Sequence, residues 1–407
     1  MRILNVTQTY FPFLEFGGPP VKVRSLSQQL VKLGHQVTVV TADWGLQSRV
    51  SADPIRSSME RSPFGWRLEE SGIQAFYLRS WLRYRALSWN PGITSFCRAR
   101  LRNFDAVHIF GLYDFLGPAI AAACRRSGIP YIVEPIGMYV PIVRNFLLKR
   151  MYHLALGQGM LRGSRKVIAT SPQEVAELAS SGLPTEKIAV RRNGVEIPES
   201  LPERGQFRAP LGIPENVKLI LYLGRLSEKK SPDLLLKAVA ALCKQEREEE
   251  LCLVFAGPDE GGMKEKLLQM AGELGIASRV HIQGAVFGEQ KWSAYRDADV
   301  FVLPSQNENF GNTAGEAIVA GTPVVVTNKC GIAPLLADIA GLVVEHDAPA
   351  IAHALARVLW ESGLHAKLSA GCKTVAALLD WNEPARAMET LYENLVNGEK
   401  EAAELLH

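Results

Sequence analysis

Short apolar runs alternate with longer amphipathic stretches along almost the whole chain. Runs rich in branched and aromatic residues predict buried strands, and the first series is RILNVTQ, HQVTVVTA, AVHIFG, IPYIVEP and KVIATS. The amphipathic stretch VKVRSLSQQLVKLG predicts a helix that stops at a glycine. A second series follows, made of LILYLGRLS, LCLVFAGP, RVHIQGAV, DVFVLPS and TPVVVTN. This alternation predicts an α/β fold with parallel sheets and crossover helices.

The two series predict two domains, because 407 residues are too many for one ordinary core. The polar, proline-containing stretch ESLPERGQFRAPLG, residues 199–212, is the expected linker. We expect one doubly wound, Rossmann-like domain over residues 1–198 and another over 213–378. Residues 379–407 are expected to form a helix that crosses back toward the first domain. Ligands would bind in the cleft between the facing domains, at the carboxyl ends of the strands.

Charge is distributed unevenly although the net charge is only +3. The chain through Arg192 contains 25 Lys and Arg against 12 Asp and Glu, whereas the remainder contains 20 against 30. A basic half predicts an anionic partner for that half, and a merely solubilising excess is the alternative. The six cysteines form no CxxC pair, which is typical of a reducing compartment. The chain enters a strand without a signal-peptide pattern, so we expect a cytoplasmic protein.

The segment SQNENFGNTAGEAIVAGTPVVV, residues 305–326, contains two carboxylates with seven residues between them, Glu308 and Glu316. A buried strand precedes the segment, a polar loop follows Glu308, and Glu316 lies in a helix-forming run. Such a loop presents backbone N–H groups, and a helix N-terminus favours negative charge. The pattern predicts a site for a phosphate-bearing ligand whose hydroxyls meet the two carboxylates. The alternative is that Glu308 caps the helix and Glu316 is solvated.

Two further loops are candidates for phosphate binding. Gly17 and Gly18 follow the first strand, where glycine lets the backbone approach a phosphate, although a plain tight turn is equally compatible. Arg225 and Lys230 follow the first strand of the second series, where both can converge on one diphosphate. Lys229 competes with Lys230 for this role, and a solvated basic loop is the alternative.

Metal binding has little support in the sequence. Asp297 and Asp299 form a DxD, but they lie where a helix would end and a strand begin. The eight histidines show no HxH or HExxH spacing. We therefore expect no metal and no nicotinamide cofactor, since the first glycine loop is not GxGxxG.

Two basic segments of the first half also contain aromatic and aliphatic residues. The first contains Arg79, Arg83, Arg85, Arg98, Arg100 and Arg102 with Trp81, Tyr84, Trp89 and Phe96. The second contains Arg144, Lys149, Arg150, His153, Arg162, Arg165 and Lys166 with Phe146, Leu147, Leu148, Met151 and Leu154. This mixture favours contact with an anionic membrane or a lipid-linked acceptor. A packed helix with a solvated basic face is the alternative, and no nucleic-acid-binding motif accompanies the segments.

Over nearly its full length the chain resembles the retaining GT-B glycosyltransferases of family 4. The resemblance rests on FGGPPVKVRSLSQQLVKLGHQVTVVT, VIATSPQEVAEL, RRNGVEIP, GRLSEKKSPDLLLKA, LVFAGP, ADVFVLPS and the E-x7-E block with EAIVAGTPVVVT. It implies transfer of a sugar from a nucleoside-diphosphate sugar with retained configuration and without a metal. The implied catalytic residues are Arg225, Lys230 and Glu308. The implied donor-binding residues are Gly17, Gly18, Asn309, Phe310, Gly311, Asn312, Thr313 and Glu316.

The chain departs from this family in the first domain. Many relatives place a histidine after the fifth-strand proline and another in the fourth strand, whereas this chain has Ile136 and Phe110. Glu134 and Tyr139 are the nearest polar candidates on the acceptor side. Glu134 is either the acceptor's base or a structural residue beneath the sheet edge.

The sequence and its resemblance to this family thus predict a metal-independent hexosyltransferase, in the cytoplasm or at the inner membrane face, that acts on a glycan or lipid-linked acceptor in envelope polysaccharide biosynthesis. Its partners would be the nucleotide-sugar donor and that acceptor, and nucleic acid is not expected. A nucleotide-sugar epimerase of the same architecture and a non-catalytic sugar-nucleotide-binding subunit are the alternatives.

Overall fold

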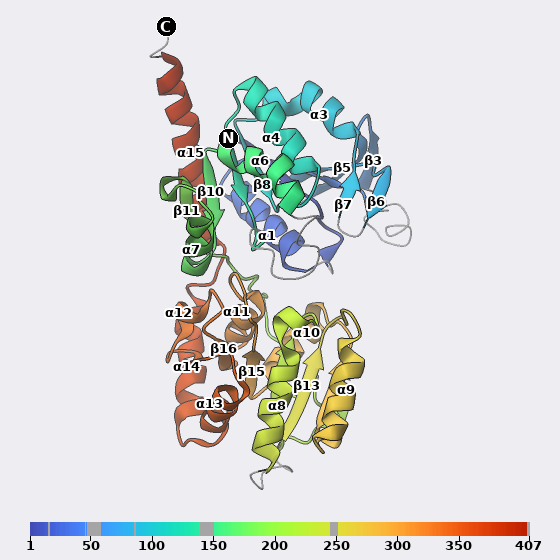
Figure 1. Cartoon of the computed structure of the whole chain (residues 1–407), viewed down its shortest axis with the longest axis vertical. Coiled ribbons are helices and arrows are strands. Elements are labelled where there is room, and N and C mark those ends of the chain that lie inside the picture. Colours follow the sequence, from blue (N-terminus) through green and yellow to red (C-terminus); the bar gives the residue numbers. More distant parts are fainter. Residues whose placement is uncertain are drawn as a thin grey trace. The chain divides into compact units, whose positions relative to one another are not determined.

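A computed structural model describes residues 1–14, 17–44, 46, 58–84, 87–138, 150–244 and 251–404. The chain divides into two compact units (Figure 1). Unit 1 comprises Met1–Gly194 together with Trp381–His407, and unit 2 comprises Val195–Asp380. The α/β expectation is confirmed, because each unit is a largely parallel sheet covered by helices on both faces.

Unit 1 is built on a nine-stranded sheet in the order β11-β10-β9-β8-β1-β2-β5-β4-β3. Its parallel strands are β1 (Arg2–Thr7), β2 (Gln36–Ala42), β5 (Ile73–Leu78), β8 (Ala106–Phe110), β9 (Tyr131–Glu134), β10 (Lys166–Ala169) and β11 (Ile188–Val190). At one edge, β4 (Gly65–Glu70) and β3 (Met59–Ser62) run antiparallel to their neighbours. A separate hairpin pairs β6 (Leu82–Tyr84) with β7 (Leu87–Trp89).

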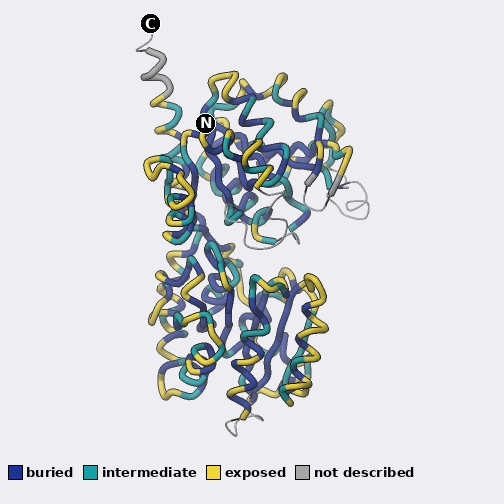
Figure 2. The backbone as a smooth tube through the Cα atoms, viewed as in Figure 1, coloured by how far each residue is buried: buried dark blue, intermediate teal, exposed yellow. Residues whose placement is uncertain are grey.

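Two helical layers cover the unit 1 sheet. On one face lie α3 (Gly92–Arg100), α4 (Leu116–Ser127), α6 (Gln158–Gly163) and α7 (Pro172–Ser180). The opposite face is covered by α1 (Gly18–Lys32) and the C-terminal α15 (Asn382–Glu404). The strands alternate between these layers, since Leu4 and Val6 face the first whereas Ile3 faces the second. The tube in Figure 2 shows the resulting buried interior.

Unit 2 has a six-stranded parallel sheet in the order β14-β13-β12-β15-β16-β17. The strands are β12 (Lys218–Leu223), β13 (Leu251–Ala256), β14 (Val280–Gln283), β15 (Val300–Leu303), β16 (Val324–Thr327) and β17 (Gly341–Val344). The helices are α8 (Pro232–Leu242), α9 (Met263–Glu273), α10 (Gly288–Asp297), α11 (Asn312–Val319), α12 (Ala333–Leu336), α13 (Ala348–Trp360) and α14 (Leu364–Ala376). Successive strands are added outward from β12 and then outward from β15, so the order reverses between these two strands.

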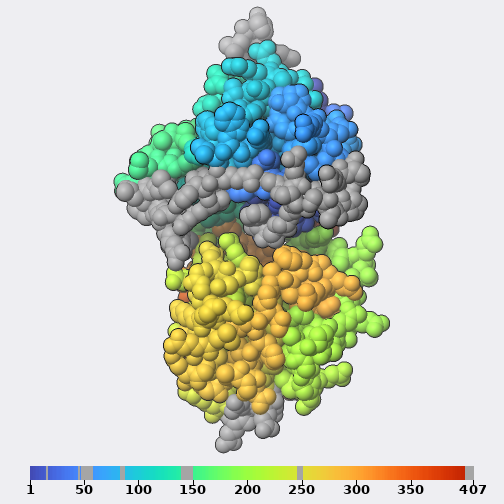
Figure 3. Space-filling model, turned by 90° about the vertical axis from the view of Figure 1, so that its right-hand side faces the viewer, coloured from blue at the N-terminus to red at the C-terminus, as the bar shows by residue number. Residues whose placement is uncertain are grey.

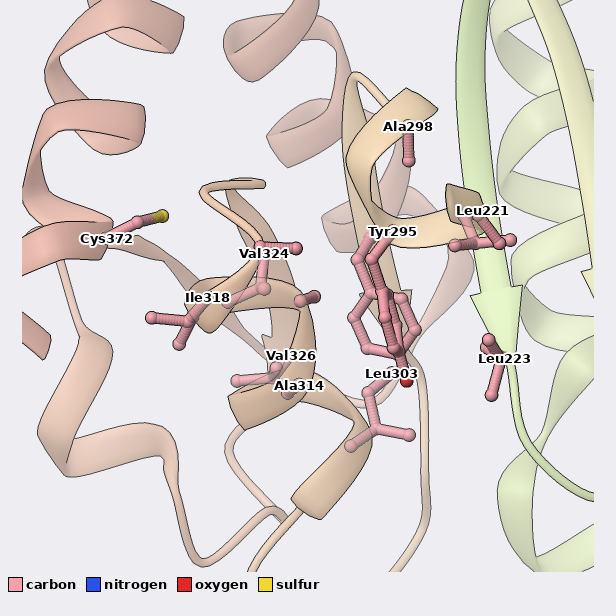
Figure 4. Packing of buried hydrophobic residues seen from close by; sticks show 14 of the residues in the cluster. Leu221, Leu223, Tyr295, Ala298, Leu303, Ala314, Ile318, Val324, Val326 and Cys372 are labelled. Atoms are coloured by element: carbon pink, nitrogen blue, oxygen red, sulfur yellow. The ribbon is translucent and has the colours of Figure 1, made fainter. Parts of the chain in front are cut away.

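The cores of unit 2 are aliphatic with a few large rings. Figure 4 shows the Tyr295 ring between Leu223 of β12 and Ala314 of α11. Both its neighbours and the ring are buried, which fixes α10 and α11 against the same end of the sheet.

Part of the segment expected to be the linker is packed against unit 2. Phe207 and Arg208 are buried, and the carboxylate of Asp297 accepts hydrogen bonds from the backbone N–H groups of Gly205, Phe207 and Arg208. Asp299 accepts from the N–H of Leu219 and pairs with Arg208. Both carboxylates of the DxD therefore fasten residues 205–219 to unit 2. The pair lies between the end of α10 and the start of β15, as the sequence predicted.

Among the described residues, no helix is long and apolar enough to cross a bilayer.

Candidate active site

The loops at the carboxyl ends of β12 and β15 lie next to each other, because these strands are neighbours in the sheet. This is the point at which the strand order reverses, where ligands of open α/β sheets bind. The adjacent loop after β13 approaches closely, since a β-carbon on Gly257 would lie 1.9 Å from the carbonyl oxygen of Gly224. Gly224 and Gly257 have φ values of 158° and 152°. The close approach of these loops therefore requires glycine.

Lys230 and Glu308 form an ion pair across this edge. Lys230 ends the short helical turn Glu228–Lys230 after β12, and Glu308 follows β15. Gln306 bonds the same turn twice, through its N–H to the carbonyl of Lys229 and through its amide to that of Glu228. Burial and the neighbouring cations Lys229 and Arg225 lower the pKa of Lys230 to about 7, whereas the Glu308 carboxylate favours its charged form. The structure thus selects Lys230, and not Lys229, as the lysine that meets Glu308.

Arg225 lies between β12 and this turn, with its side chain 62% exposed. Its guanidinium is 3.6 Å from the carboxylate of Glu260, a separation too long for a strong exposed ion pair. Its backbone carbonyl accepts a 2.6 Å hydrogen bond from the buried hydroxyl of Tyr222, which fixes the loop. The guanidinium is therefore available to an anionic ligand, and its field already acts on Lys230.

The loop after Glu308 leads directly into α11. Gly311 caps the helix with a φ of 107°, and a β-carbon there would lie 3.0 Å from Ile332 and 3.2 Å from Leu303. The side chain of Phe310 is buried in the core, so only its backbone can face a ligand. Asn312 and Thr313 form the first turn of α11, whose N–H groups have no intrahelical acceptor. The side-chain nitrogen Nδ2 of Asn309 is buried without a hydrogen-bond partner among the described residues.

Glu316 lies one turn into α11 and is held by two residues of α10. Lys291 Nζ is 2.7 Å from one carboxylate oxygen, and the Tyr295 hydroxyl donates to the other at 2.8 Å. Burial and the adjacent carboxylate raise the pKa of Tyr295 well above its ordinary value, so the hydroxyl remains a donor. Both carboxylate oxygens of Glu316 are therefore held, which excludes the alternative that its side chain is merely solvated.

At the corresponding edge of unit 1, Gly17 precedes α1 with a φ of 102° and ψ of −151°. Gly18 is the first residue of the helix, and prolines follow it within the first turn. A proline in the first turn costs no hydrogen bond, because those N–H positions lack intrahelical acceptors. The Gly17–Gly18 loop thus presents the N-terminus of a long helix beside the end of β1.

Glu134 ends β9 and is fully buried among charged groups. One carboxylate oxygen accepts from Lys22 of α1 and the other from Arg191. Burial alone would raise the pKa of Glu134, but Arg191 and Lys22 hold it well below its ordinary value. The structure supports the structural role for Glu134 and not the role of acceptor base. Tyr139, the other acceptor-side candidate, lies outside the described residues.

The network around Glu134 continues through His108 of β8 to the C-terminal helix. His108 Nδ1 is 2.8 Å from the hydroxyl of Tyr392 in α15, and Nε2 is 3.5 Å from Glu134. Burial lowers the pKa of His108 to about 4, so the ring is neutral near pH 7. The Arg191 guanidinium also lies over the Trp381 ring, 5.6 Å from its centroid. These contacts join α1, β8, β9 and α15 beneath the carboxyl edge of the unit 1 sheet.

The two positions at which the chain departs from its relatives differ in character. Phe110 is buried, with its ring centroid 3.8 Å from that of His108. Ile136 lies in a turn directly after β9 with a φ of 54°. A β-branched residue in this left-handed region is strained, and such strain is concentrated at functional sites.

The sequence alone did not indicate the roles of Lys22, Arg191, Lys291 and Tyr295. Lys22 had a detectable signal, because it lies one turn before Leu26 and two turns before Leu30 on the buried stripe of α1. A lysine on such a stripe needs a buried partner. Lys291 and Tyr295 are four residues apart and so share one face of α10, but nothing in the sequence names Glu316 as their partner.

Comparison with known proteins identifies the family. Residues 203–374 match the model described as glycosyl transferases group 1, and residues 17–194 match the glycosyl transferase 4-like domain. A D-inositol 3-phosphate glycosyltransferase from Frankia alni is 30% identical over 410 residues, which span 94% of this chain and 95% of that protein. The chain belongs to the GT-B glycosyltransferases. The relationship extends over both units of this glycosyltransferase.

Solved structures show the same fold at lower identity. Anabaena HepE, solved in complex with UDP and glucose, has a TM-score of 0.75 and 17% identity over 97% of this chain and 100% of that one. The sucrose-phosphate synthase from Thermosynechococcus elongatus has a TM-score of 0.71 and 20% identity over 98% and 99% of the two chains. These likenesses confirm the expected GT-B α/β fold of the glycosyltransferase.

Proposed function

We propose that this glycosyltransferase moves a sugar from a nucleoside-diphosphate sugar to an acceptor hydroxyl, with retention and without a metal. The proposal rests on one observation. Arg225, Lys230, Glu308 and the N-terminus of α11 lie together between β12 and β15, where the strand order of unit 2 reverses. A departing diphosphate gains negative charge in the transition state, and fixed cations and N–H donors stabilise that charge. The UDP and UDP-glucose complexes of HepE are consistent with such a donor.

The Lys230–Glu308 ion pair suggests how the donor enters. An incoming diphosphate competes with the Glu308 carboxylate for the Lys230 ammonium. Glu308 is then released toward the hydroxyls of the donor sugar, while Arg225 adds a second cation from the exposed side. The diphosphate favours charged Lys230, which offsets the effect of burial and neighbouring cations on its pKa.

Retention is proposed to follow a front-face displacement. The leaving diphosphate oxygen and the acceptor hydroxyl share one face of the sugar, and that oxygen takes the acceptor's proton. This route uses no carboxylate base from unit 1, which accords with Glu134 being buried and ion-paired. Glu316, held by Lys291 and Tyr295, is proposed to receive the ribose hydroxyls.

The acceptor is proposed to be a glycan or lipid-linked compound of envelope polysaccharide biosynthesis, bound by unit 1 in the cytoplasm or at the inner membrane face. The charge of residues 1–192 supports an anionic acceptor or surface. The name of the Frankia alni relative, D-inositol 3-phosphate glycosyltransferase, supports a phosphorylated acceptor as the second candidate. The comparisons do not favour the epimerase, and a non-catalytic role now rests only on Ile136 and Phe110.

Glu316→Gln is expected to weaken binding of the nucleotide sugar by about 10- to 100-fold, because a charge-assisted hydrogen bond contributes about 1.5–3 kcal/mol. Arg225→Ala should instead lower kcat and leave the donor dissociation constant within a few-fold. Isothermal titration calorimetry and initial rates separate the two effects. Glu265→Gln, an exposed change on α9, is the matched control. Small and equal effects of Glu316→Gln and Arg225→Ala would refute the site assignment.

A further inference from the structure

On one face of unit 1, the described helices α3, α4 and α6 contain basic residues and no Asp or Glu. Residues 71–104, 115–133 and 135–173 contain no Asp or Glu, and they provide α3, α4, α6 and the hairpin β6–β7. Figure 1 shows α4 and α6 in front of the sheet with α3 beside them. The opposite layer differs, since α15 alone contains Glu383, Glu389 and Glu393. The positive charge of unit 1 is therefore concentrated on the α3–α4–α6 face.

A groove between α3 and α4 has a volume of about 630 Å³. Its floor is apolar, formed by residues such as Ile93, Leu101 and Ala123, and its rim is formed by Arg98, Arg102 and Arg126. None of these three guanidinium groups has an ion pair or hydrogen bond within the part of the chain that the structure describes. Arg125 differs from these three arginines, because its guanidinium donates hydrogen bonds to the Tyr131 hydroxyl and to the carbonyl of Gly159. Three unpaired cations above an apolar floor are complementary to an anionic amphiphile.

Large apolar side chains are exposed on the elements next to this groove. Trp81 and Leu82 are 69% and 73% exposed at the start of the hairpin, and Trp89 of β7 is 51% exposed. Met151 and Leu154, on the helical segment 150–163, are 59% and 60% exposed. Ring contacts from Trp89 through Phe115 to Tyr152 connect the hairpin with that segment. Figure 3 looks onto the edge of unit 1 where β6, β7 and α3 lie, in blue to cyan.

The geometry points to the α3–α4 groove as a headgroup site for an acidic phospholipid, through which the α3–α4–α6 face docks on an anionic bilayer. This inference deepens the membrane contact of the proposed function and does not involve the donor site. Exposed tryptophans and aliphatic side chains beside arginines are typical of an interfacial surface. Nucleic-acid binding depends mainly on contacts from basic and polar groups to phosphates, whereas a bilayer also buries exposed aliphatic groups such as Leu82, Met151 and Leu154, which favours the bilayer as the partner. The side chains of Arg83, Tyr84 and Leu87 lie outside the described part of the chain. So do residues 85–86 and 139–149, which include Arg85, Arg144, Phe146 and Lys149 of the two basic segments.

Vesicle co-sedimentation of the full chain tests the proposal. The protein should bind vesicles of phosphatidylcholine with phosphatidylglycerol and should not bind phosphatidylcholine alone. Arg98→Gln/Arg102→Gln/Arg126→Gln should weaken binding about 100-fold, because each arginine near an anionic surface contributes close to a factor of five. Soluble glycerol phosphate should compete only weakly, since it offers no bilayer to the exposed tryptophans.

The matched control removes the same charge elsewhere. Lys32→Gln/Arg386→Gln/Lys373→Gln alters exposed residues of α1, α15 and α14, and should retain most of the binding. An equal loss of vesicle binding in both triple variants would show that only net charge matters and would refute the α3–α4 groove as the headgroup site. Tighter binding to single-stranded DNA than to the vesicles would overturn the bilayer as partner. Both variants should have the melting temperature of the wild type and the same rise of that temperature with the nucleotide sugar. A failure of the proposed donor site would therefore be distinguished from a failure of membrane binding.

Discussion

Lys230→Met is expected to lower kcat by about 10²- to 10³-fold, the usual effect of removing one group that stabilises transition-state charge. Lys230 is the cation that meets Glu308, and the proposal places the departing diphosphate at this ammonium. The donor dissociation constant should change much less, because Arg225 and the N-terminus of α11 still attract the diphosphate. Single-turnover rates and donor titration measure the two quantities separately.

Lys229→Met is the control for this prediction. Lys229 is adjacent in the same turn, and the turn uses its backbone carbonyl to bind Gln306. Replacing its side chain leaves that hydrogen bond and should change kcat by less than about threefold, as for residues that do not contact the reacting groups. Equal losses from Lys229→Met and Lys230→Met would mean that the loop acts only through its total charge.

Glu134→Gln is expected to destabilise unit 1 by about 3–5 kcal/mol, the effect of removing one partner from a buried ion cluster. The change leaves Lys22 and Arg191 buried without their shared counter-charge. The midpoint of urea unfolding should fall accordingly. Unfolding should be followed with probes in each unit, because two units need not unfold in one step.

Asp233→Asn provides the exposed counterpart to Glu134→Gln. Asp233 pairs with Lys237 at 3.6 Å on the surface of α8, where an ion pair contributes about 0–1 kcal/mol. A comparably small loss for Glu134→Gln would contradict the buried network as the element that joins α1, β9 and α15. In that case Glu134 would again be a candidate for the acceptor's base.

Each of the ten predicted runs corresponds to a strand, from β1 to β16. Most of these strands are buried on both faces, which gives a strong local signal of branched and aromatic residues, whereas β14 is only partly buried. Strands β3, β4, β5, β6, β7 and β11 were not among the predicted runs. MERS of β3 and GWRLEE of β4 are largely polar and only partly buried, whereas IQAFYL of β5 is a buried apolar run that the same pattern could have identified. Strand β17 (GLVV) was also missed, although it has the same four-residue length as the recognised β15 and β16.

The limits of the second domain depended on contacts distant in sequence. Residues 199–212 have the composition of a linker, yet Phe207 and Arg208 are buried because Asp297 binds their N–H groups. Nothing local to the segment indicates a carboxylate about ninety residues later in the chain. The units divide instead at Gly194 and Asp380.

For the site, the sequence located the loops but not the partners of their side chains. Glu308, Glu316 and Lys230 lie at the ends of strongly predicted strands, where a parallel sheet brings loops together. The ion pair of Lys230 with Glu308 and the contacts of Glu316 with Lys291 and Tyr295 depend on side-chain packing between α10, α11 and the sheet. The partners of Glu134 depend on packing in the same way, because Lys22 lies on α1 and Arg191 lies after β11.

A thermal-shift panel tests the proposed metal-free nucleotide-sugar site in unit 2. UDP-, GDP-, ADP- and dTDP-sugars are each added with and without EDTA. A ligand that binds only the folded protein at about 100 times its dissociation constant adds about 2.7 kcal/mol, enough for a shift of several degrees. We expect one nucleotide class to raise the melting temperature, EDTA to leave this shift unchanged, and Glu316→Gln to remove most of the shift. No shift with any donor, or a shift abolished by EDTA, would contradict this expectation.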